Sequence, residues 1–586
     1  MRNSICILLV LCGMLLCGIR GHGQDIRLWV AASSDVHGAI FPYDLGTGRS
    51  LPYSLAHLST FLKQLRSKAG ENLVLLDNGD LIQGDPASYH ANFVAAEDTH
   101  LFVRAMNYLG YDAATVGNHD IEAGHAVYDR FRDQLGIPWM AANAVHTGKD
   151  QPWFRPYHIV ERQGIRIAIL GLVTPSIPEW LPPVLWEGME FKDMASEASR
   201  WMDTIQLRES PDLVIGLFHS GADTSWMKQG FQAPGHENAA AWVAHSVKGF
   251  DVIFCGHDHQ GWNMKVAGPG GDSVLILGTT SRARDVALAE IVLTKDVQGS
   301  LTKQIRGNLV LLSDYPPDAD FLSRFSTDIH SIREFVADTL GWLDTTLIAA
   351  EAVFGPCPFT DLIHRAQMDL SGADISFTAP LSTRSRLLPG PMTTGMLFDL
   401  YRYENYLYVM ELQGKEIDGF LEHAVKGWFS MMRIPEDALL DYEREPDGRI
   451  RVRYGQPQTK GIFYHFSSAA GLRYTLDLCG PPGDRVHILG MSNGQDFHAD
   501  SVYRVAVNSY RGSGGGGHLT MGAGIARDSL ASRVIWTSDH DLRYHLMDWF
   551  RQHSPVQHKK VTEWGLVPEG WYREAVLRER PLWGLP

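Results

Sequence analysis

The sequence predicts an α/β protein made of two domains, and three observations support this prediction. The chain has 586 residues, more than a single compact core normally accommodates. In its amino-terminal half, short apolar runs alternate with segments whose apolar residues recur at helical spacing. The carboxy-terminal half contains further apolar runs and another helical segment. We therefore expect two α/β domains joined by a connecting helix.

Five short apolar runs in the amino-terminal half are typical of buried strands, because glycine or polar residues bound each of them. They lie at 28–30, 73–76, 113–116, 214–218 and 252–255. Two helices are predicted between the first three runs. The first is indicated by the spacing of Leu55, Leu58, Leu62 and Leu65, and the second by Val103, Met106 and Leu109. Gly110 then favours a helix end.

Each predicted strand leads into a cluster of polar side chains that can bind a metal. The clusters are Asp35-Val36-His37, Gly79-Asp80, Gly117-Asn118-His119-Asp120, His219-Ser220-Gly221 and Gly256-His257-Asp258-His259. Ligands of open α/β sheets bind beyond the carboxyl ends of the strands, so the clusters should converge. The pair His257 and His259 alone is weak evidence, because a histidine beside an apolar run is more often a hydrogen-bonded structural residue. The other four clusters favour a shared site.

The residue types in these clusters predict a site for two divalent metals. Carboxylates, imidazoles and one amide occur without a cysteine cluster, which suits zinc, manganese, iron(II) or cobalt. A carboxylate can bridge two ions about 3.5–4 Å apart, and such a pair can stabilise both the attacking and the leaving oxygen in a displacement at phosphorus. The expected chemistry is phosphoester hydrolysis.

In this order the motifs D-x-H, G-D-x-x-Q-G, G-N-H-D, H-S-G and G-H-x-H resemble those of the calcineurin-like metallophosphoesterases. Within that superfamily the chain is most similar to the bacterial periplasmic nucleotidases, which comprise 5′-nucleotidases and 2′,3′-cyclic-nucleotide phosphodiesterase/3′-nucleotidases. The resemblance implies a four-layer α/β/β/α sandwich with a dinuclear centre. It assigns the first metal to Asp35, His37 and His259, the second to Asn118, His219 and His257, and the bridge between them to Asp80.

The resemblance and the expected metals together predict that a metal-bound hydroxide attacks phosphorus in line. His119 is then expected near the leaving group, where a protonated imidazole stabilises negative charge. Asn118 is expected to contact the substrate as well as a metal. Many relatives orient the histidine with an aspartate three residues later, whereas this chain has Glu122 there and Asp120 as an alternative. Glu122 could instead simply begin a helix, where acidic residues are favoured.

The carboxy-terminal half is predicted to supply base recognition. Strands are expected at 407–412, 472–476 and 502–507, with a helix at 417–423. The segments at 402–405 and 508–517 resemble those whose aromatic rings sandwich a nucleotide base in the family, with Tyr403 and Tyr510 at the ring positions. Stacking contributes roughly 1–3 kcal/mol per base and tolerates different bases. The alternative is that each tyrosine packs a loop.

The glycine run from Gly514 to Gly517 has no following Gly-Lys-Ser/Thr, so it is not a P-loop. We expect it to give a ligand close access to the backbone. Where Gly516 stands, some relatives have an aspartate near the base or sugar, so base preference stays open.

The domain boundaries follow from changes of pattern. Residues 1–23 are expected to be a cleaved secretory signal, because a basic start precedes a short apolar stretch and two small residues. The metallophosphoesterase domain is expected at 24–310 and the substrate-binding domain at 345–550. A linker helix is expected at 311–344, from the helical spacing of Leu322, Phe325, Ile329, Ile332, Val336 and Leu340. Three tryptophans predict that the tail, 551–586, packs on the body.

The amino-acid composition limits which partners and which cellular location are expected. The chain is 45% apolar and 20% charged, as in globular proteins. A formal net charge of −15 argues against a nucleic-acid polymer as the main partner. After the signal only Cys255, Cys357 and Cys479 remain, which provides no disulfide framework and suits a bacterial periplasm. No later apolar stretch is long enough to span a bilayer.

The leading prediction is a secreted phosphohydrolase with two metal ions that acts on small-molecule nucleotides. A 2′,3′-cyclic or 3′-nucleotide is favoured over a 5′-nucleotide, because the segment at 377–381 stands where 5′-nucleotidases carry an N-G-G-G-I-R type sequence. Two alternatives stay open. One is a 5′-nucleotidase or UDP-sugar hydrolase, and the other is a nucleotide-binding surface protein that has lost catalysis. The oligomeric state and the native metals also stay open.

Overall fold

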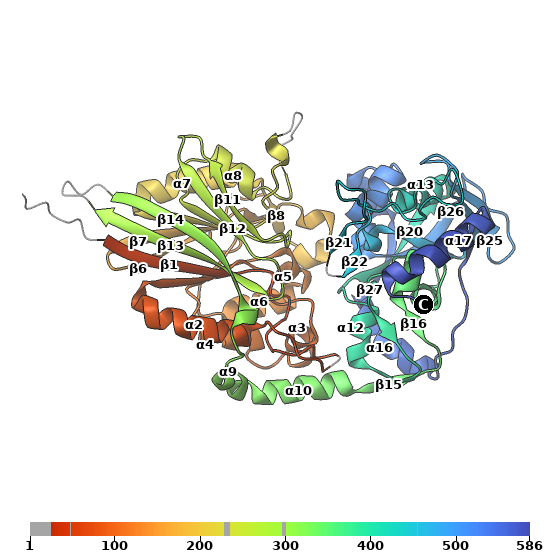
Figure 1. The fold of residues 1–586 in the computed structure, drawn as a ribbon, viewed down its shortest axis with the longest axis horizontal. Helices are drawn as coiled ribbons and strands as arrows, with labels where there is room; N and C mark the ends of the chain where they lie inside the picture. Colours follow the sequence, from red (N-terminus) through yellow and green to blue (C-terminus); the bar gives the residue numbers. More distant parts are fainter. Residues whose placement is uncertain (1–24, 47, 228–234, 296–300, 454) are drawn as a thin grey trace, which may run out of the picture.

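The computed structural model describes residues 25–46, 48–227, 235–295, 301–453 and 455–586. The expected signal sequence, 1–23, lies outside the described residues. Figure 1 shows two bodies, one coloured red to green and the other green to blue, connected along one side by helices α9 (Ala319–Arg324) and α10 (Ser326–Ala337). Within the described residues, no helix is long and apolar enough to cross a membrane.

Two six-stranded sheets form the amino-terminal domain. The first has the strand order β14-β13-β1-β2-β3-β4 and the second β11-β12-β10-β9-β7-β6. The strands of the first are β1 (Asp25–Ser33), β2 (Leu73–Asp77), β3 (Ala113–Thr115), β4 (Trp139–Met140), β13 (Asp285–Lys295) and β14 (Leu301–Leu311). Those of the second are β6 (Tyr157–Arg162), β7 (Ile165–Val173), β9 (Leu213–His219), β10 (Val252–Cys255), β11 (Trp262–Ala267) and β12 (Ser273–Gly278).

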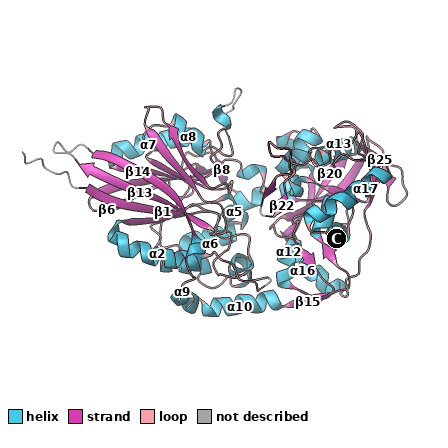
Figure 2. Cartoon of the chain, viewed as in Figure 1, coloured by secondary structure: helices cyan, strands magenta, loops and turns pink. Residues whose placement is uncertain are grey.

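The sheets pack face to face and carry helices on their outer sides, as Figure 2 also shows. The inner core combines Val30 and Leu76 from the first sheet with Ile215 and Phe254 from the second. Helices α2 (Leu55–Ala69) and α4 (Leu101–Leu109) cover the first sheet, and α7 (Met194–Glu209) and α8 (Ala240–Ser246) cover the second. The four-layer α/β/β/α sandwich implied by the resemblance is confirmed.

Strand direction determines where the polar clusters lie. Strands β1, β2, β3 and β4 run parallel, and so do β7, β9, β10 and β12. The predicted ligands follow the carboxyl ends of β1, β2, β3, β9 and β10. Because the two sheets are stacked, these five ends meet at one edge of the sandwich, on the side that faces the carboxy-terminal domain (Figure 1).

The carboxy-terminal domain is built around a five-stranded sheet with the order β23-β17-β26-β20-β27. Its strands are β17 (Ile375–Thr378), β20 (Tyr406–Gln413), β23 (Ser468–Ala470), β26 (Val502–Asn508) and β27 (Val534–Asp541). Helices α11 (Pro358–Ser371), α13 (Gly414–Val425) and α16 (Leu542–His553) pack on it. The predicted strands at 407–412 and 502–507 are β20 and β26, and the predicted helix at 417–423 lies within α13.

The chain's last segment contributes to the same domain. Strand β28 (Glu563–Val567) pairs in parallel with β24 (Leu472–Asp477), which also pairs with β25 (Val486–Met491). Helix α17 (Glu569–Glu579) follows. Trp564 and Trp583 are buried in the domain core, while Trp571 is partly buried against it. The residues expected to form a packed tail therefore supply a strand and a helix.

The predicted single linker helix is wrong. The structure has two helices, α9 (Ala319–Arg324) and α10 (Ser326–Ala337), separated at Phe325, whose φ of −105° and ψ of 19° are not helical. The apolar spacing continues to Leu340, but this residue belongs to strand β15 (Thr339–Leu343), which pairs with β19 (Gly390–Thr393). The spacing of apolar residues indicates which positions are buried and does not by itself show that they belong to one helix. Leu340 is buried against the second domain.

Candidate active site

The carboxylate and imidazole ligands predicted from the sequence form two groups at this edge of the sandwich. Within each group the candidate ligand atoms lie within 4.8 Å of one another. The first group is Asp35, His37 and His259, and the second is Asp80, His219 and His257. The first group has the three residues that the resemblance assigns to the first metal, and the second has the expected bridge, Asp80, with two residues assigned to the second metal.

In the first group the donor atoms face one another closely. His259 Nε2 lies 3.3 Å from Asp35 Oδ1 and 3.1 Å from His37 Nε2. His37 Nε2 also lies 3.9 Å from Asp80 Oδ2, which links this group to the second. Burial lowers the pKa of His37 to about 3, so its imidazole is neutral near pH 7 and keeps a lone pair available for a cation.

Asn118 completes the second group. Its Oδ1 lies 2.8 Å from His257 Nδ1 and 3.1 Å from His219 Nε2. His219 Nε2 is in turn 3.1 Å from Asp80 Oδ2. All seven predicted ligands are therefore brought together, and Asp80 lies between the two groups, where a bridging carboxylate is expected.

The second ring nitrogen of each histidine in this group already has an acceptor. His219 Nδ1 donates to the backbone carbonyl of Asn78 at 2.7 Å, and His257 Nε2 donates to Glu237 Oε1 at 2.9 Å. Neutral imidazoles with these hydrogens point their other lone pair at the oxygens of Asn118 and Asp80. Lone pairs repel at such distances unless a cation lies between them, so this donor set fits a divalent metal.

Without a cation, a proton takes its place at His219. Burial lowers the pKa of this imidazole, but the charge of Asp80 outweighs burial and raises the pKa to about 10. Metal binding must displace that proton, because only the deprotonated nitrogen can be a ligand.

Five of the predicted ligands adopt a backbone conformation that residues other than glycine rarely adopt. The φ angles are 53° for Asp35, 45° for His37, 55° for Asp80, 70° for His257 and 56° for His259. Each such residue costs about 1–3 kcal/mol of strain, and strain of this kind concentrates at functional sites. Its concentration at the predicted ligands supports a functional role for the three loops that carry them, after β1, β2 and β10.

Two glycines allow the ligand loops to pass one another. A Cβ at Gly256 would lie 2.1 Å from Ser34 Oγ and 2.6 Å from Asp35 Oδ2, and a Cβ at Gly117 would lie 2.1 Å from Asp80 Oδ1. A larger residue at either position would therefore displace a predicted ligand.

His119 lies beside the two groups and pairs with Glu122. Its Nδ1 forms a short contact with Glu122 Oε2, and its backbone N–H donates to Asp80 Oδ1 at 2.8 Å. Burial lowers the pKa of His119, but Asp80 and Glu122 outweigh it and raise the pKa to about 9. An imidazolium at this position can supply a proton.

Asp120, the alternative partner, is occupied elsewhere. Its carboxylate accepts the backbone N–H groups of Gly117, Asp80, Leu81 and Ile82 at 2.8–3.2 Å. Asp120 therefore fixes the Asp80 loop, which leaves Glu122 as the partner of His119. Asp77, adjacent to this loop, accepts from Ser33 Oγ at 2.6 Å and from Gly79 N at 3.2 Å, and it belongs to neither group of possible metal ligands.

A cavity of about 1160 Å³ connects the ligand cluster to the carboxy-terminal domain. Its amino-terminal wall includes His37, Asn118, His119, Glu122, His257 and His259. Its carboxy-terminal wall includes Tyr403, Asn405, Tyr464, His465, Tyr510 and Arg511. The volume suffices for a nucleotide-sized ligand, since ligand sites commonly measure about 300–1000 Å³.

Strand pairing positions the two predicted stacking residues. Tyr403 precedes β20 and Tyr510 follows β26, and these antiparallel strands place Leu407 opposite Asn508. The two tyrosines thus leave the sheet at the same edge. The Tyr510 ring lies 6.4 Å from the His465 ring at an interplanar angle of 24°, and the Arg511 guanidinium lies 5.3 Å from the Tyr510 ring centroid.

The glycine run packs more closely on protein side chains than expected. A Cβ at Gly515 would lie 2.6 Å from the Tyr510 ring, and one at Gly516 would lie 2.3 Å from Arg511 Nη1. Arg511 Nη1 also donates to the Gly515 carbonyl at 2.8 Å. The glycines line the cavity, but their local role is to let the backbone seat Tyr510 and Arg511.

Several cavity residues were not predicted from the sequence. On the amino-terminal wall these are Glu237 and Trp180. The Trp180 ring stacks on the His257 ring, with 5.3 Å between the ring centroids and an interplanar angle of 22°. On the opposite wall they are Tyr464, His465 and Arg511. None stands at ligand spacing in the sequence. Arg511 directly follows the predicted Tyr510, which is the one signal that pointed to it.

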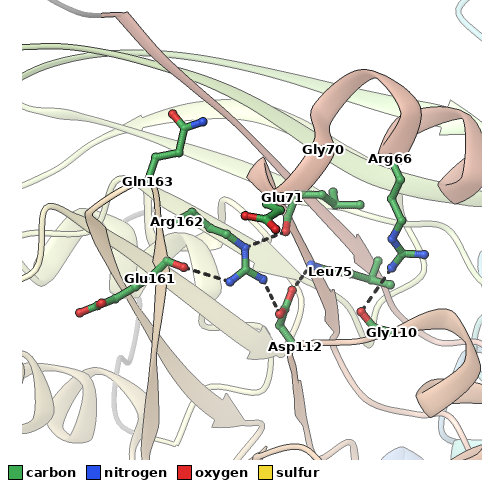
Figure 3. A pocket seen from close by; sticks show the side chains of 10 residues that line it. Arg66, Gly70, Glu71, Leu75, Gly110, Asp112, Glu161, Arg162 and Gln163 are labelled. Carbon is green, nitrogen blue, oxygen red and sulfur yellow. Dashed lines mark hydrogen bonds and ion pairs between the residues drawn. The ribbon is translucent and has the colours of Figure 1, made fainter.

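Two other features lie away from this cavity. A polar hollow of about 350 Å³ near the opposite ends of β2 and β7 is shown in Figure 3. Arg162 pairs there with Asp112 at 2.6 Å, and Arg66 donates to the backbone carbonyls of Leu109 and Gly110. A third group of possible metal ligands, Asp539, His540 and His545, lies at the protein surface.

Comparison with protein families agrees with this arrangement. Residues 28–261 match the model described as calcineurin-like phosphoesterase, and residues 337–523 match the model described as 5′-nucleotidase, C-terminal domain. The chain thus combines a calcineurin-like phosphoesterase domain at 28–261 with a 5′-nucleotidase carboxy-terminal domain at 337–523. It is therefore a metal-dependent phosphoester hydrolase by family, and calcineurin-like phosphoesterases bind two divalent metals.

Individual relatives are distant but extend over most of the chain. A trifunctional nucleotide phosphoesterase protein of Bacillus subtilis is 24% identical over 93% of this chain, which spans only 39% of that protein. A 2′,3′-cyclic-nucleotide 2′-phosphodiesterase/3′-nucleotidase of Haemophilus influenzae is 23% identical over 93% of this chain and 88% of its own length.

Solved structures share the fold of both domains. A Staphylococcus aureus structure determined with alpha-ketoglutarate matches with a TM-score of 0.74 at 20% identity, covering 92% of this chain and 100% of that one. A 5′-nucleotidase precursor of Thermus thermophilus matches with a TM-score of 0.62 at 20% identity, over 93% and 100% of the two chains.

Proposed function

We propose that the protein hydrolyses phosphoesters of small-molecule nucleotides, with 2′,3′-cyclic nucleotides and 3′-nucleotides as its preferred substrates. The observation behind the proposal is one cavity with Tyr403 and Tyr510 on one wall and four of the predicted metal ligands on the other, namely His37, Asn118, His257 and His259. A ligand that needs both walls must combine a phosphate with an aromatic ring, and a nucleotide has both.

The phosphate end of the reaction is assigned to the amino-terminal domain. Asp35, His37 and His259 would hold one divalent ion, Asn118, His219 and His257 the other, with Asp80 between them. Ions bound there would polarise the phosphoryl oxygens and lower the pKa of the attacking water. His119, oriented by Glu122, donates a proton to the leaving oxygen of the ribose.

The base end is assigned to Tyr403 and Tyr510, whose rings stack on the base. Stacking discriminates weakly among bases, so we expect broad base tolerance. The segment at 345–550 is then the substrate-binding domain, and 24–310 is the domain that holds the metals. Asn118 takes part in both metal binding and substrate binding, because it contacts the bound phosphate as well as an ion.

The preference for cyclic and 3′-nucleotides rests on the sequence at 377–381, of which Phe377, Thr378, Ala379 and Leu381 line the cavity. The Haemophilus influenzae relative bears the corresponding activity in its name. A 5′-nucleotidase or UDP-sugar hydrolase is the second candidate, because the family of the carboxy-terminal domain carries the 5′-nucleotidase name.

A substrate panel tests these proposals. Initial rates are measured with 2′,3′-cyclic AMP, 3′-AMP, 5′-AMP and UDP-glucose after metal removal with EDTA and restoration with Zn²⁺, Mn²⁺ or Co²⁺. The proposal expects hydrolysis of the first two at the highest kcat/KM. Hydrolysis confined to 5′-AMP or UDP-glucose would establish the second candidate. Adenosine binding without phosphate release from any substrate would establish a non-catalytic binding protein.

We also propose that the protein is secreted, because residues 1–23 have the composition of a cleaved signal. Export to the periplasm in a bacterial host, with a mature amino terminus at Gln24, is the expected result. Retention in the cytoplasm with residues 1–23 intact would contradict it.

A further inference from the structure

Glu237 is a carboxylate of the cavity wall that none of the five ligand motifs contains. It precedes α8, and its Oε1 lies 2.9 Å from His257 Nε2. The other nitrogen of this ring, Nδ1, faces Asn118 Oδ1 at 2.8 Å. His257 therefore lies directly between Glu237 and the second group of predicted ligands.

The backbone of Glu237 is anchored beside another predicted ligand. Ser220, the residue after His219, donates its hydroxyl to the Glu237 carbonyl at 2.7 Å. The same hydroxyl accepts the backbone N–H of Ala239 at 2.8 Å. The carboxylate is thus held from the strand end that supplies His219, although its own side chain is about 45% exposed.

We propose that Glu237 is a positioning residue of the metal centre, which holds His257 in the tautomer and ring orientation that a ligand through Nδ1 requires. A hydrogen on Nε2, donated to the carboxylate, leaves the lone pair on Nδ1. The negative charge of the carboxylate also favours donation of that lone pair to a cation. Trp180, stacked on the ring face at 5.3 Å, restricts rotation in the other direction.

The second histidine of the group provides an internal comparison. His219 Nδ1 donates to the carbonyl of Asn78, a neutral and fully buried acceptor. His257 is the one that uses a charged, partly exposed acceptor. A backbone carbonyl therefore orients His219, whereas a side chain orients His257. Only the partner of His257 can be removed by a substitution.

The inference rests on the proposed function, because it takes His257 as a ligand. The experiment measures Co²⁺ binding to the metal-free protein by titration calorimetry and by the visible absorption of bound Co²⁺. The variants are Glu237→Ala, Glu237→Gln, His257→Ala and Asp80→Ala. Glu161→Gln is the matched control, since Glu161 is an ion-paired carboxylate of the same domain in the distant polar hollow (Figure 3).

In Glu237→Ala, one of two Co²⁺ ions should bind about 10- to 100-fold more weakly, the range typical of lost partners of metal ligands. The other ion should bind as in wild type. Glu237→Gln should lose less, because its amide oxygen accepts the same hydrogen without the charge. Added Co²⁺ should restore the activity of Glu237→Ala, and Glu161→Gln should match wild type. A general loss of folding would lower both affinities together and would not be rescued.

Three outcomes would overturn the proposal. Unchanged affinity for both ions in Glu237→Ala, with one ion lost in His257→Ala, would remove the positioning role and leave the metal assignment intact. Retention of both ions in His257→Ala would remove His257 from the ligand set, and the proposal with it. A loss in Glu237→Ala as complete as in Asp80→Ala would make Glu237 itself a ligand.

Discussion

The two walls of the central cavity are built from different kinds of interaction. On the amino-terminal wall, the ligands extend from five strand ends, most of them are buried, and five of them have positive φ. On the carboxy-terminal wall, partly exposed tyrosines follow or precede paired strands, and glycines let the backbone pack beneath Tyr510. One wall concentrates charge and strain, and the other offers aromatic surface.

This difference indicates how tolerant each wall should be. Lone pairs that face one another at about 3 Å require a cation or a proton between them. A single substitution in the metal wall that weakens cation binding therefore affects all of the ligands. A stacking surface loses only the contribution of the ring that is removed. The predictions below test this contrast in order of expected effect.

The largest effect is expected from Asp80→Ala. Asp80 approaches ligands of both groups, so its removal should lower kcat/KM for every substrate by about 1000-fold or more, as several kcal/mol of charge stabilisation are lost. Asp133→Ala, at an aspartate that is 70% exposed on the same domain, is the control. Activity within tenfold of wild type in Asp80→Ala would refute a bridging role.

His119→Asn should separate proton donation from phosphate binding. The kcat for 3′-AMP should fall by about 100- to 10,000-fold, the usual contribution of a general acid. The fall should be smaller with p-nitrophenyl phosphate, whose leaving group needs no proton. Glu122→Gln should show the same pattern more weakly. An equal fall on both substrates would assign His119 to another role.

Tyr510→Ala should affect the other wall alone. The loss of roughly 1–3 kcal/mol of stacking should raise KM for nucleotides by about 5- to 150-fold and leave p-nitrophenyl phosphate hydrolysis nearly unchanged. Tyr544→Ala, at a tyrosine that is 40% exposed on α16, controls for loss of a surface ring. Parallel losses on both substrates would mean that Tyr510 supports the fold and not the base.

The smallest effect concerns stability. Burial raises the pKa of Glu404, next to Tyr403, to about 8, although Arg543 opposes it. The folded protein therefore keeps a proton on Glu404 that the unfolded chain releases near pH 4.5. The contribution of Glu404 to the free energy of unfolding is fully present below about pH 4.5 and is lost as the pH rises to 8. Glu404→Gln should flatten the decline in melting temperature of the metal-free protein between pH 5 and 8. Parallel curves would contradict the assignment.

The metal wall was predictable because its signals are local. Each ligand cluster directly follows an apolar run, and parallel strands necessarily carry such clusters to one edge. The pairing of His119 with Glu122 instead of Asp120 depended on four backbone hydrogen bonds that occupy Asp120, and three of these join chain segments 38 to 40 residues apart. Sequence spacing alone could not decide between the two acids.

Glu237 and Trp180 were not predictable, because they reach His257 from loops that carry no periodic pattern. The prediction of a single linker helix reaching Leu340 failed for a related reason, since Leu340 has the spacing of a helix but belongs to strand β15 and is buried by the second domain. In the carboxy-terminal domain, Tyr403 and Tyr510 were found by resemblance to known segments. His465 and Tyr464, which complete that wall, lie in a segment for which no element was expected.

The central claim is that one wall performs the chemistry and the other selects the substrate. The most direct measurement compares kcat/KM for 2′,3′-cyclic AMP and p-nitrophenyl phosphate in wild type and in the double variant Tyr403→Ala/Tyr510→Ala, each with metals removed and restored. Metal removal should abolish both activities, and the double variant should lose only the nucleotide activity once metals are restored. Nucleotide hydrolysis that persists without metals, or equal loss of both activities in the metal-restored double variant, would contradict the account.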